Sequence, residues 1–182
     1  MKKVIIIHGF KGNPEEGWKP WLKKELESQG YKVLVPPMPN SERPKLNEWL
    51  CSLGQTIGMP NEDTYMVGHS LGCITIIRYL EGLSDEAKIG GAVFVGGFTS
   101  NIGLEEFENF FKTDIDWKKV KQKSNSFTAI HSTNDPYVSL DHSNSFKEKL
   151  KAETIIEEDK GHFFGDDGVT ELPSVLKAIV SK

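Results

Sequence analysis

Residues 64–73 read TYMVGHSLGC, and this stretch decides the fold because it places a serine between two glycines directly after an apolar run. The run predicts a strand over Thr64 to Val67, and the residues after Ser70 predict a helix over Leu71 to Leu80. In a Gly-x-Ser-x-Gly turn of this kind, a strained backbone lifts the serine hydroxyl above the sheet. The flanking glycines remove Cβ atoms that would collide. We therefore predict that Ser70 is a nucleophile.

Short apolar runs and helical patterns alternate along the whole chain. Several runs are β-branched and apolar on successive residues, which is typical of parallel strands covered on both faces. We expect a three-layer α/β domain with a mostly parallel six-stranded sheet, strand order 2-1-3-4-5-6, and helices on both faces. The predicted strands are Val4 to Ile7, Lys32 to Val35, Thr64 to Val67, Gly91 to Val95, Phe127 to His131 and Thr154 to Glu157.

Apolar residues at helical spacing predict the helices that cover this sheet. The last helix should begin at Leu172, with Pro173 in its first turn. The predicted buried stripes are Trp18, Trp21, Leu22 and Leu26; Leu46, Trp49, Leu50, Leu53 and Ile57; and Val175, Leu176, Ile179 and Val180.

Length and charge limit the classes of function. The 182 residues suit one domain, residues 1–182. A net charge of −4 offers phosphate backbones no general attraction, so no nucleic acid partner is expected. No apolar run approaches the roughly 18 residues of a membrane-spanning helix, and the two cysteines are too few for a disulfide framework. We expect a cytoplasmic protein, with monomer and small homo-oligomer both left open.

A serine hydroxyl is a poor nucleophile near neutral pH, so Ser70 needs a base. Only His162 lies on a loop after the last predicted strand, in KGHFFG, where flanking glycines let it reach across the strand ends. The order serine, acid, histidine is the one expected for this kind of turn. The remaining histidines precede Ser70, end a strand or lie in a predicted helix: His8, His69, His131 and His142.

The acid that orients the base should lie between the serine and the histidine. Asp135 follows the fifth predicted strand, and Pro136 fixes the turn after it. An Asx turn would use the same residues, and Asp114 and Asp116 are rival acids. Three further aspartates near His162 are interpreted as solvated loop charges rather than metal ligands, because a lone histidine among them lacks ligand spacing: Asp159, Asp166 and Asp167.

Acyl transfer also requires donors for the charge that develops on the carbonyl oxygen. The amide of Leu71, at the start of a predicted helix, is one donor by position. The second should come from the loop after the first strand, His8 to Lys11, with the Phe10 amide as the candidate. In the expected strand order both donors converge beside Ser70.

Several motifs spread over nearly the whole chain carry a family resemblance. They are His8-Gly9, Trp18 with Trp21-Leu22, Met38-Pro39-Asn40, Trp49, Gly68 to Cys73, Gly96-Gly97-Phe98, Asp135-Pro136 and Gly161-His162. With them the chain resembles α/β-hydrolases of the retinoblastoma-binding protein nine and YdeN-like type. The resemblance implies a compact α/β-hydrolase-like fold without a large lid, and a serine hydrolase with Ser70, Asp135 and His162 as its triad. The Leu-x-Cys-x-Glu sequence linked with retinoblastoma binding is absent, so no partner of that type is inferred.

The substrate pocket is less clearly defined by the sequence. The segment Gly96 to Trp117 is rich in apolar residues and could fold as a small flap over Ser70 or pack as a helix in the core. The candidate substrate contacts, which favour a small or medium acyl group, are Phe98, Phe107, Phe110 and Phe163.

These residues together predict a serine hydrolase acting on a small-molecule acyl ester, or on a thioester or amide, through an acyl-enzyme. No cofactor or metal is required. Two alternatives stay open, an acyltransferase that excludes water and a binding protein on a hydrolase scaffold. Cys73, one turn into the helix after Ser70, is interpreted as a small buried residue rather than a thiol nucleophile.

Overall fold

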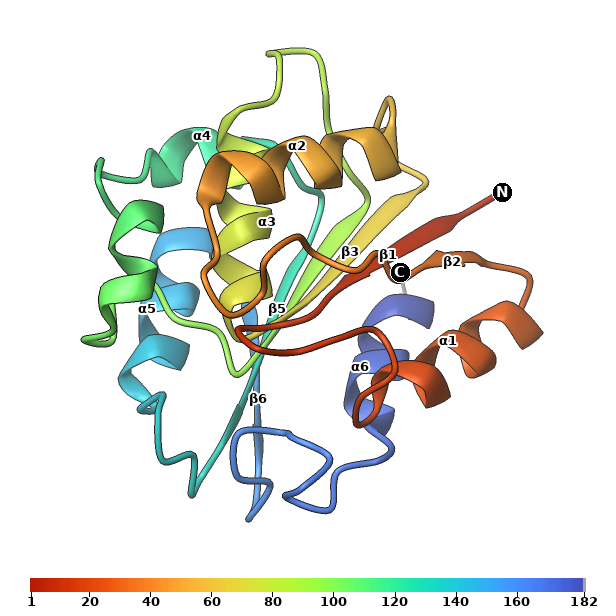
Figure 1. Cartoon of the computed structure of the whole chain (residues 1–182). Helices are drawn as coiled ribbons and strands as arrows, with labels where there is room; N and C mark the ends of the chain where they lie inside the picture. Colours follow the sequence, from red (N-terminus) through yellow and green to blue (C-terminus); the bar gives the residue numbers. More distant parts are fainter. Residues whose placement is uncertain (182) are drawn as a thin grey trace.

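The computed structural model describes residues 1–181 and contains one sheet of six strands (Figure 1). Its order is β2-β1-β3-β4-β5-β6, and every neighbouring pair is parallel, so the predicted topology is confirmed. The strands are β1 (Lys3–Ile7), β2 (Lys32–Leu34), β3 (Thr64–His69), β4 (Gly91–Val95), β5 (Phe127–Ser132) and β6 (Glu153–Glu157). Their bounds agree with the sequence predictions to within two residues at either end.

Helices cover both faces of the sheet. They are α1 (Lys19–Ser28), α2 (Leu46–Ile57), α3 (Leu71–Glu81), α4 (Trp117–Gln122), α5 (Asp141–Leu150) and α6 (Pro173–Val180), with a 3-10 helix η1 (Glu105–Phe110). Figure 1 shows α1 and α6 together on one face, with α2 to α5 on the other. Side chains of β1 alternate accordingly, because Val4 and Ile6 join the α1 and α6 core while Ile5 and Ile7 join the opposite core. Within residues 1–181, no helix is long and apolar enough to cross a membrane.

The segment between β4 and α4 packs against the core. Phe107 and Phe110, both on η1, are buried in the cluster that contains α2 and α3. Arg78 of α3 ties this segment down, because its Nε donates to the carbonyl of Phe110 at 2.9 Å and its other nitrogens donate to the carbonyls of Thr113 and Asp114. The buried guanidinium, which these carbonyls and the carboxylate of Glu81 satisfy, anchors the segment to the helix that follows Ser70.

Candidate active site

Ser70 lies between β3 and α3 in a backbone conformation that side chains rarely adopt. Its φ is 53° and its ψ is −117°. The Ser70 amide donates to the carbonyl of Val95 on the neighbouring strand at 2.9 Å. Such a conformation costs about 1–3 kcal/mol, so the surrounding structure must hold it. The strained turn presents the serine at the carboxyl end of the sheet, where ligands bind in this fold class.

Two glycines allow α3 to pack closely enough to impose this turn. A Cβ atom on Gly68 would lie 2.6 Å from the amide nitrogen of Cys73. A Cβ atom on Gly72 would lie 2.3 Å from the carbonyl oxygen of Ile7. Both neighbours are backbone atoms, which cannot move aside as a flexible side chain can. Close packing of α3 on β1 and β3 therefore explains both glycines of the motif.

Ser70, His162 and Asp135 form a continuous chain of hydrogen bonds. Nε2 of His162 lies 2.8 Å from Oγ of Ser70, and Nδ1 of His162 lies 2.7 Å from Oδ2 of Asp135. A proton on Nδ1 that is donated to the carboxylate leaves Nε2 free to accept from the serine hydroxyl. The side chains of His162 and Asp135 are 4% and 0% exposed, so water competes little for these bonds.

The second carboxylate oxygen of Asp135 is held by the backbone of its own turn. Oδ1 accepts from the amides of Tyr137 at 2.9 Å and Val138 at 3.0 Å. This is the Asx turn that the sequence left open as an alternative. The two interpretations are compatible, because one oxygen makes the turn while the other contacts His162.

The loop that carries His162 depends on Asp167. Oδ2 of Asp167 accepts from the amides of His162 and Phe164, both at 2.9 Å. Asp167 is exposed on the loop, as the sequence predicts, but it also holds the loop through these two bonds, a role that the sequence did not indicate. Three aspartates lie near His162 in the sequence, and no spacing rule indicates which of them folds back onto the loop.

Residues after β5 hold the same loop from the other side. Oδ1 of Asn134 accepts from the amide of Gly161 at 2.8 Å, and Oγ of Ser132 accepts from the amide of Lys160 at 2.9 Å. The segment that supplies Asp135 thus also positions the segment that supplies His162. The sequence analysis missed these contacts because polar residues in turns are common and have many other uses.

The loop after β1 passes directly against Ser70. A Cβ atom on Gly9 would lie 3.0 Å from Cβ and 3.6 Å from Oγ of Ser70. His8 holds this loop, because its Nε2 accepts from the amide of Met38 and its Nδ1 donates to the carbonyl of Gly9, both at 2.9 Å. Burial is the main cause that lowers the pKa of His8 below its usual value, which favours the neutral ring that these two bonds require.

The amides of Phe10 and Leu71 are the donors predicted for a substrate oxygen. Within residues 1–181 neither amide donates a hydrogen bond to a protein group. The next two amides of the first loop, those of Lys11 and Gly12, donate to backbone carbonyls instead. The Leu71 amide also lies at the N-terminus of α3, where negative charge is favoured. Both predicted donors are thus without a protein acceptor in the described residues.

His69 links the turn of Ser70 to the loop of His162. Its Nε2 donates to the backbone carbonyl of His162 at 2.8 Å. Burial, followed by the nearby charges of His162 and Lys19, holds the pKa of His69 well below its usual value. His69 is therefore a neutral hydrogen-bond donor between the two segments.

The rival residues have other contacts. Asp116 caps α4, with its Oδ1 accepting from the amide of Lys119 at 2.9 Å, and Asp114 offers its main-chain carbonyl to Arg78. Cys73 is buried, and this burial raises the pKa of its thiol, which keeps it protonated. In the part of the chain that the structure describes, no group of three or more His, Cys, Asp or Glu side chains could hold a metal ion.

The four phenylalanines predicted to contact substrate lie in the core. Phe98, Phe107, Phe110 and Phe163 are each at most 2% exposed. Phe98 and Phe107 stack on each other, with ring centroids 5.5 Å apart and planes only 6° apart. In this conformation none of the four presents surface to a substrate, which corrects their assignment to the pocket. A phenylalanine that packs in the core and one that lines a substrate pocket occur in the same apolar sequence pattern, so the sequence could not distinguish the two roles.

The sheet is parallel, and Ser70 lies on a tight strand-to-helix turn. An acid and a histidine that follow it along the chain are joined to it by hydrogen bonds. These features define an α/β-hydrolase. The sequence matches the serine hydrolase family over residues 4–181, and the chain belongs to this family.

Individual relatives agree with this assignment. The chain is 34% identical over 181 residues to the putative hydrolase YdeN of Bacillus subtilis (strain 168), which covers 99% of this chain and 95% of the relative. It is 27% identical over 184 residues to the serine hydrolase RBBP9 of Rattus norvegicus, covering 98% of this chain and 96% of the relative. The family resemblance predicted from the sequence motifs is thus confirmed.

Solved structures show the same fold. The crystal structure of the ydeN gene product from B. subtilis superposes with a TM-score of 0.95 at 34% identity, covering 100% of this chain and 98% of that one. Est1E from Butyrivibrio proteoclasticus superposes with a TM-score of 0.77 at 17% identity, covering 99% and 87%. At that lower identity the likeness concerns the fold alone.

Proposed function

We propose that the protein hydrolyses esters with a small or medium acyl group, with thioesters and amides as less favoured substrates. The observation that carries this proposal is the hydrogen-bonded chain from Ser70 through His162 to Asp135. The three side chains lie within hydrogen-bond distance of one another, in the order that the reaction requires. This alignment supports a hydrolase over a binding protein that merely retains the scaffold.

The proposed reaction has two steps. His162 Nε2 takes the proton of Ser70 as Oγ attacks the acyl carbon, and it then gives that proton to the leaving oxygen as the acyl–oxygen bond breaks. Asp135 holds the ring with Nδ1 protonated and stabilises the imidazolium. Water then attacks the acyl-enzyme, with His162 again taking and returning the proton, and the acid is released from Ser70.

The amides of Phe10 and Leu71 are proposed to bind the oxygen of the tetrahedral intermediate. Their lack of a protein partner and the approach of Gly9 to Ser70 support this role. Removing one such donor typically costs about 3 kcal/mol of transition-state stabilisation.

A fluorophosphonate probe tests this proposal without a guess about the substrate, because it reacts with an activated serine and imitates the tetrahedral intermediate. We expect mass spectrometry of the digested protein to locate the adduct on Ser70, and we expect no adduct in His162→Ala. His142→Ala is the matched control and should still be labelled, since His142 contacts Thr99 rather than Ser70. Folded wild-type protein that acquires no adduct would contradict the proposal.

A further inference from the structure

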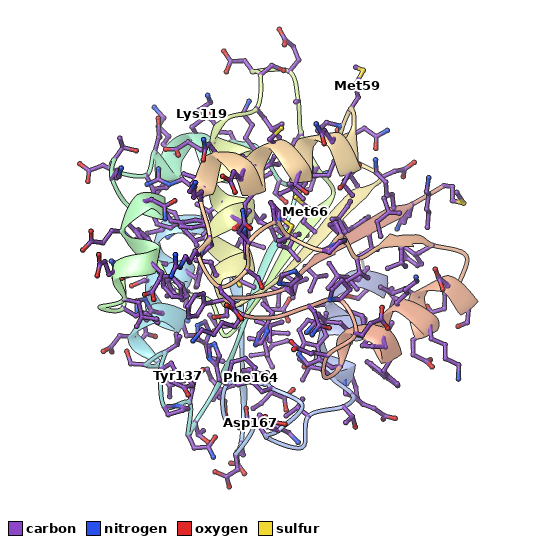
Figure 2. The ribbon with its side chains drawn as sticks, viewed as in Figure 1. Met59, Met66, Lys119, Tyr137, Phe164 and Asp167 are labelled. Carbon is purple, nitrogen blue, oxygen red and sulfur yellow. The ribbon has the colours of Figure 1, made fainter. Side chains whose placement is uncertain are left out.

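Two exposed aromatic side chains flank His162. Tyr137 is 60% and Phe164 is 36% exposed. Their ring centroids lie 5.3 Å and 4.9 Å from that of His162, and 6.4 Å from each other. Figure 2 shows both rings at the same end of the molecule, close to Asp167. Exposed apolar side chains that gather beside a reactive group typically mark a binding surface.

The same contacts that hold the site also hold these two rings. The amide of Tyr137 donates to Oδ1 of Asp135, and the amide of Phe164 donates to Oδ2 of Asp167. The Phe164 ring also packs edge-on against His69, with centroids 5.4 Å apart. The backbone of both residues is therefore held relative to His162, and the Phe164 ring is also packed on His69, which reduces the entropy lost on binding.

The chemistry of His162 determines which part of a substrate meets these rings. As the general acid, its Nε2 must lie about 3 Å from the leaving atom that it protonates. The carbonyl oxygen points the other way, toward the amides of Phe10 and Leu71. A substituent on the leaving atom therefore lies next to His162, whose ring Tyr137 and Phe164 contact.

We propose that Tyr137 and Phe164 form a subsite for the leaving group, and that this subsite takes an aromatic alcohol. This inference rests on the proposed function. The two rings are nearly perpendicular, with planes 72° apart and centroids 6.4 Å apart, so an aromatic leaving group packs beside the pair, where it meets a face of one ring and an edge of the other. Aromatic rings attract one another in these arrangements at centroid distances of about 4.5–7 Å.

The test compares acetate esters that share one acyl group and differ in their leaving group. The substrates are 2-naphthyl acetate, phenyl acetate and 2,2,2-trifluoroethyl acetate, and each variant is compared with wild type on the same ester so that intrinsic reactivity cancels. We expect Tyr137→Ala and Phe164→Ala each to lower kcat/KM about five- to tenfold for the naphthyl ester and less than about twofold for the trifluoroethyl ester. Tyr137→Phe should retain the naphthyl activity, because it keeps the ring.

Two further readouts separate a subsite from a structural role. The acyl-enzyme no longer contains the leaving group, so kcat for an ester limited by deacylation should be unchanged in Tyr137→Ala. The relative kcat/KM values for phenyl acetate, phenyl butanoate and phenyl hexanoate should also be the same in Tyr137→Ala as in wild type. Met59→Ala is the matched control, since Met59 is 92% exposed and lies at the opposite end of the molecule (Figure 2).

The outcomes distinguish this inference from the proposed function. Equal losses for all three acetates, a loss that follows acyl length, or no loss for any ester would overturn the subsite while leaving labelling of Ser70 intact. A wild-type protein that hydrolyses none of the esters and is not labelled on Ser70 would overturn both. A loss confined to the aryl esters, with deacylation unchanged, would support the subsite.

Discussion

Ser70 and His162 are held in place in different ways. The turn of Ser70 lies between two regular elements, β3 and α3, and is imposed by backbone packing at Gly68 and Gly72 (Figure 1). His162 lies between β6 and α6, on residues 158–172, where the structure has no helix or strand. Polar side chains such as Asp167 fix its position. The nucleophile is thus fixed by local steric fit, and the base by hydrogen bonds that can be removed singly.

The largest effect is expected at the turn of Ser70. Gly72→Ala places a Cβ atom 2.3 Å from the backbone oxygen of Ile7, so α3 must move away from β1. We expect a loss of more than about 3 kcal/mol in the free energy of unfolding, measured by urea denaturation, or failure to fold.

Gly54→Ala is the matched control for this substitution. Gly54 lies inside α2, and a Cβ atom there would have no neighbour within 4 Å. Alanine should stabilise the helix by about 0.5–1 kcal/mol. A Gly72→Ala protein as stable as wild type would contradict steric fixation of the turn.

The difference between steric fixation of Ser70 and hydrogen-bond fixation of His162 also determines what could be predicted from the sequence. The turn of Ser70 could be predicted because its close backbone packing requires glycines, and these glycines lie beside the serine in the sequence. His162 and Asp135 were chosen by their order along the chain and their positions after strands, and the structure brings both to Ser70. The contact made by Asp167 could not be predicted, because many polar loop residues could make it.

Aromatic residues illustrate the same limit. The sequence assigned Phe107 and Phe163 to the pocket, yet both are buried, whereas Tyr137 and Phe164 are exposed beside His162. Hydrophobic patterns indicate that a side chain will be buried somewhere. Which loop side chains remain at the surface depends on the path of the loops, and no periodicity encodes that path.

An intermediate effect is expected in the loop of His162. Asp167→Ala removes the acceptor of the amides of His162 and Phe164. We expect kcat/KM to fall about ten- to hundredfold, because displacement of a catalytic group by about 1 Å has effects of this size. The rate of fluorophosphonate labelling at Ser70 should fall in parallel, since it reports the same alignment.

Two neighbouring variants sharpen this measurement. Asp167→Asn keeps an acceptor oxygen and should recover most of the activity. Asp166→Ala removes the adjacent exposed carboxylate, which has no hydrogen-bond partner within residues 1–181, and should be nearly as active as wild type. Equal activity of Asp167→Ala and Asp166→Ala would show that the loop holds its position without Asp167.

The smallest effect is expected from His69, which connects the two regions. The pKa of His69 is lower in the folded protein than the usual value of about 6.5, so the unfolded chain binds more protons below pH 6.5 and stability falls as the pH is lowered. One such proton contributes a slope of at most about 1.4 kcal/mol per pH unit. The other histidines with lowered pKa values add to the wild-type slope in the same direction: His8, His131 and His142.

His69→Gln isolates this contribution, because the glutamine amide can still donate to the carbonyl of His162 but does not titrate. We expect the free energy of unfolding, measured with urea between about pH 7 and pH 5, to fall less steeply in the variant. The slope is the relevant quantity, since altered packing shifts the whole curve by a constant. Parallel curves would mean that burial of His69 does not contribute to acid sensitivity. A shallower curve would show that the region of Ser70 responds to pH through a buried neutral ring, whereas the loop of His162 depends on acceptors such as Asp167.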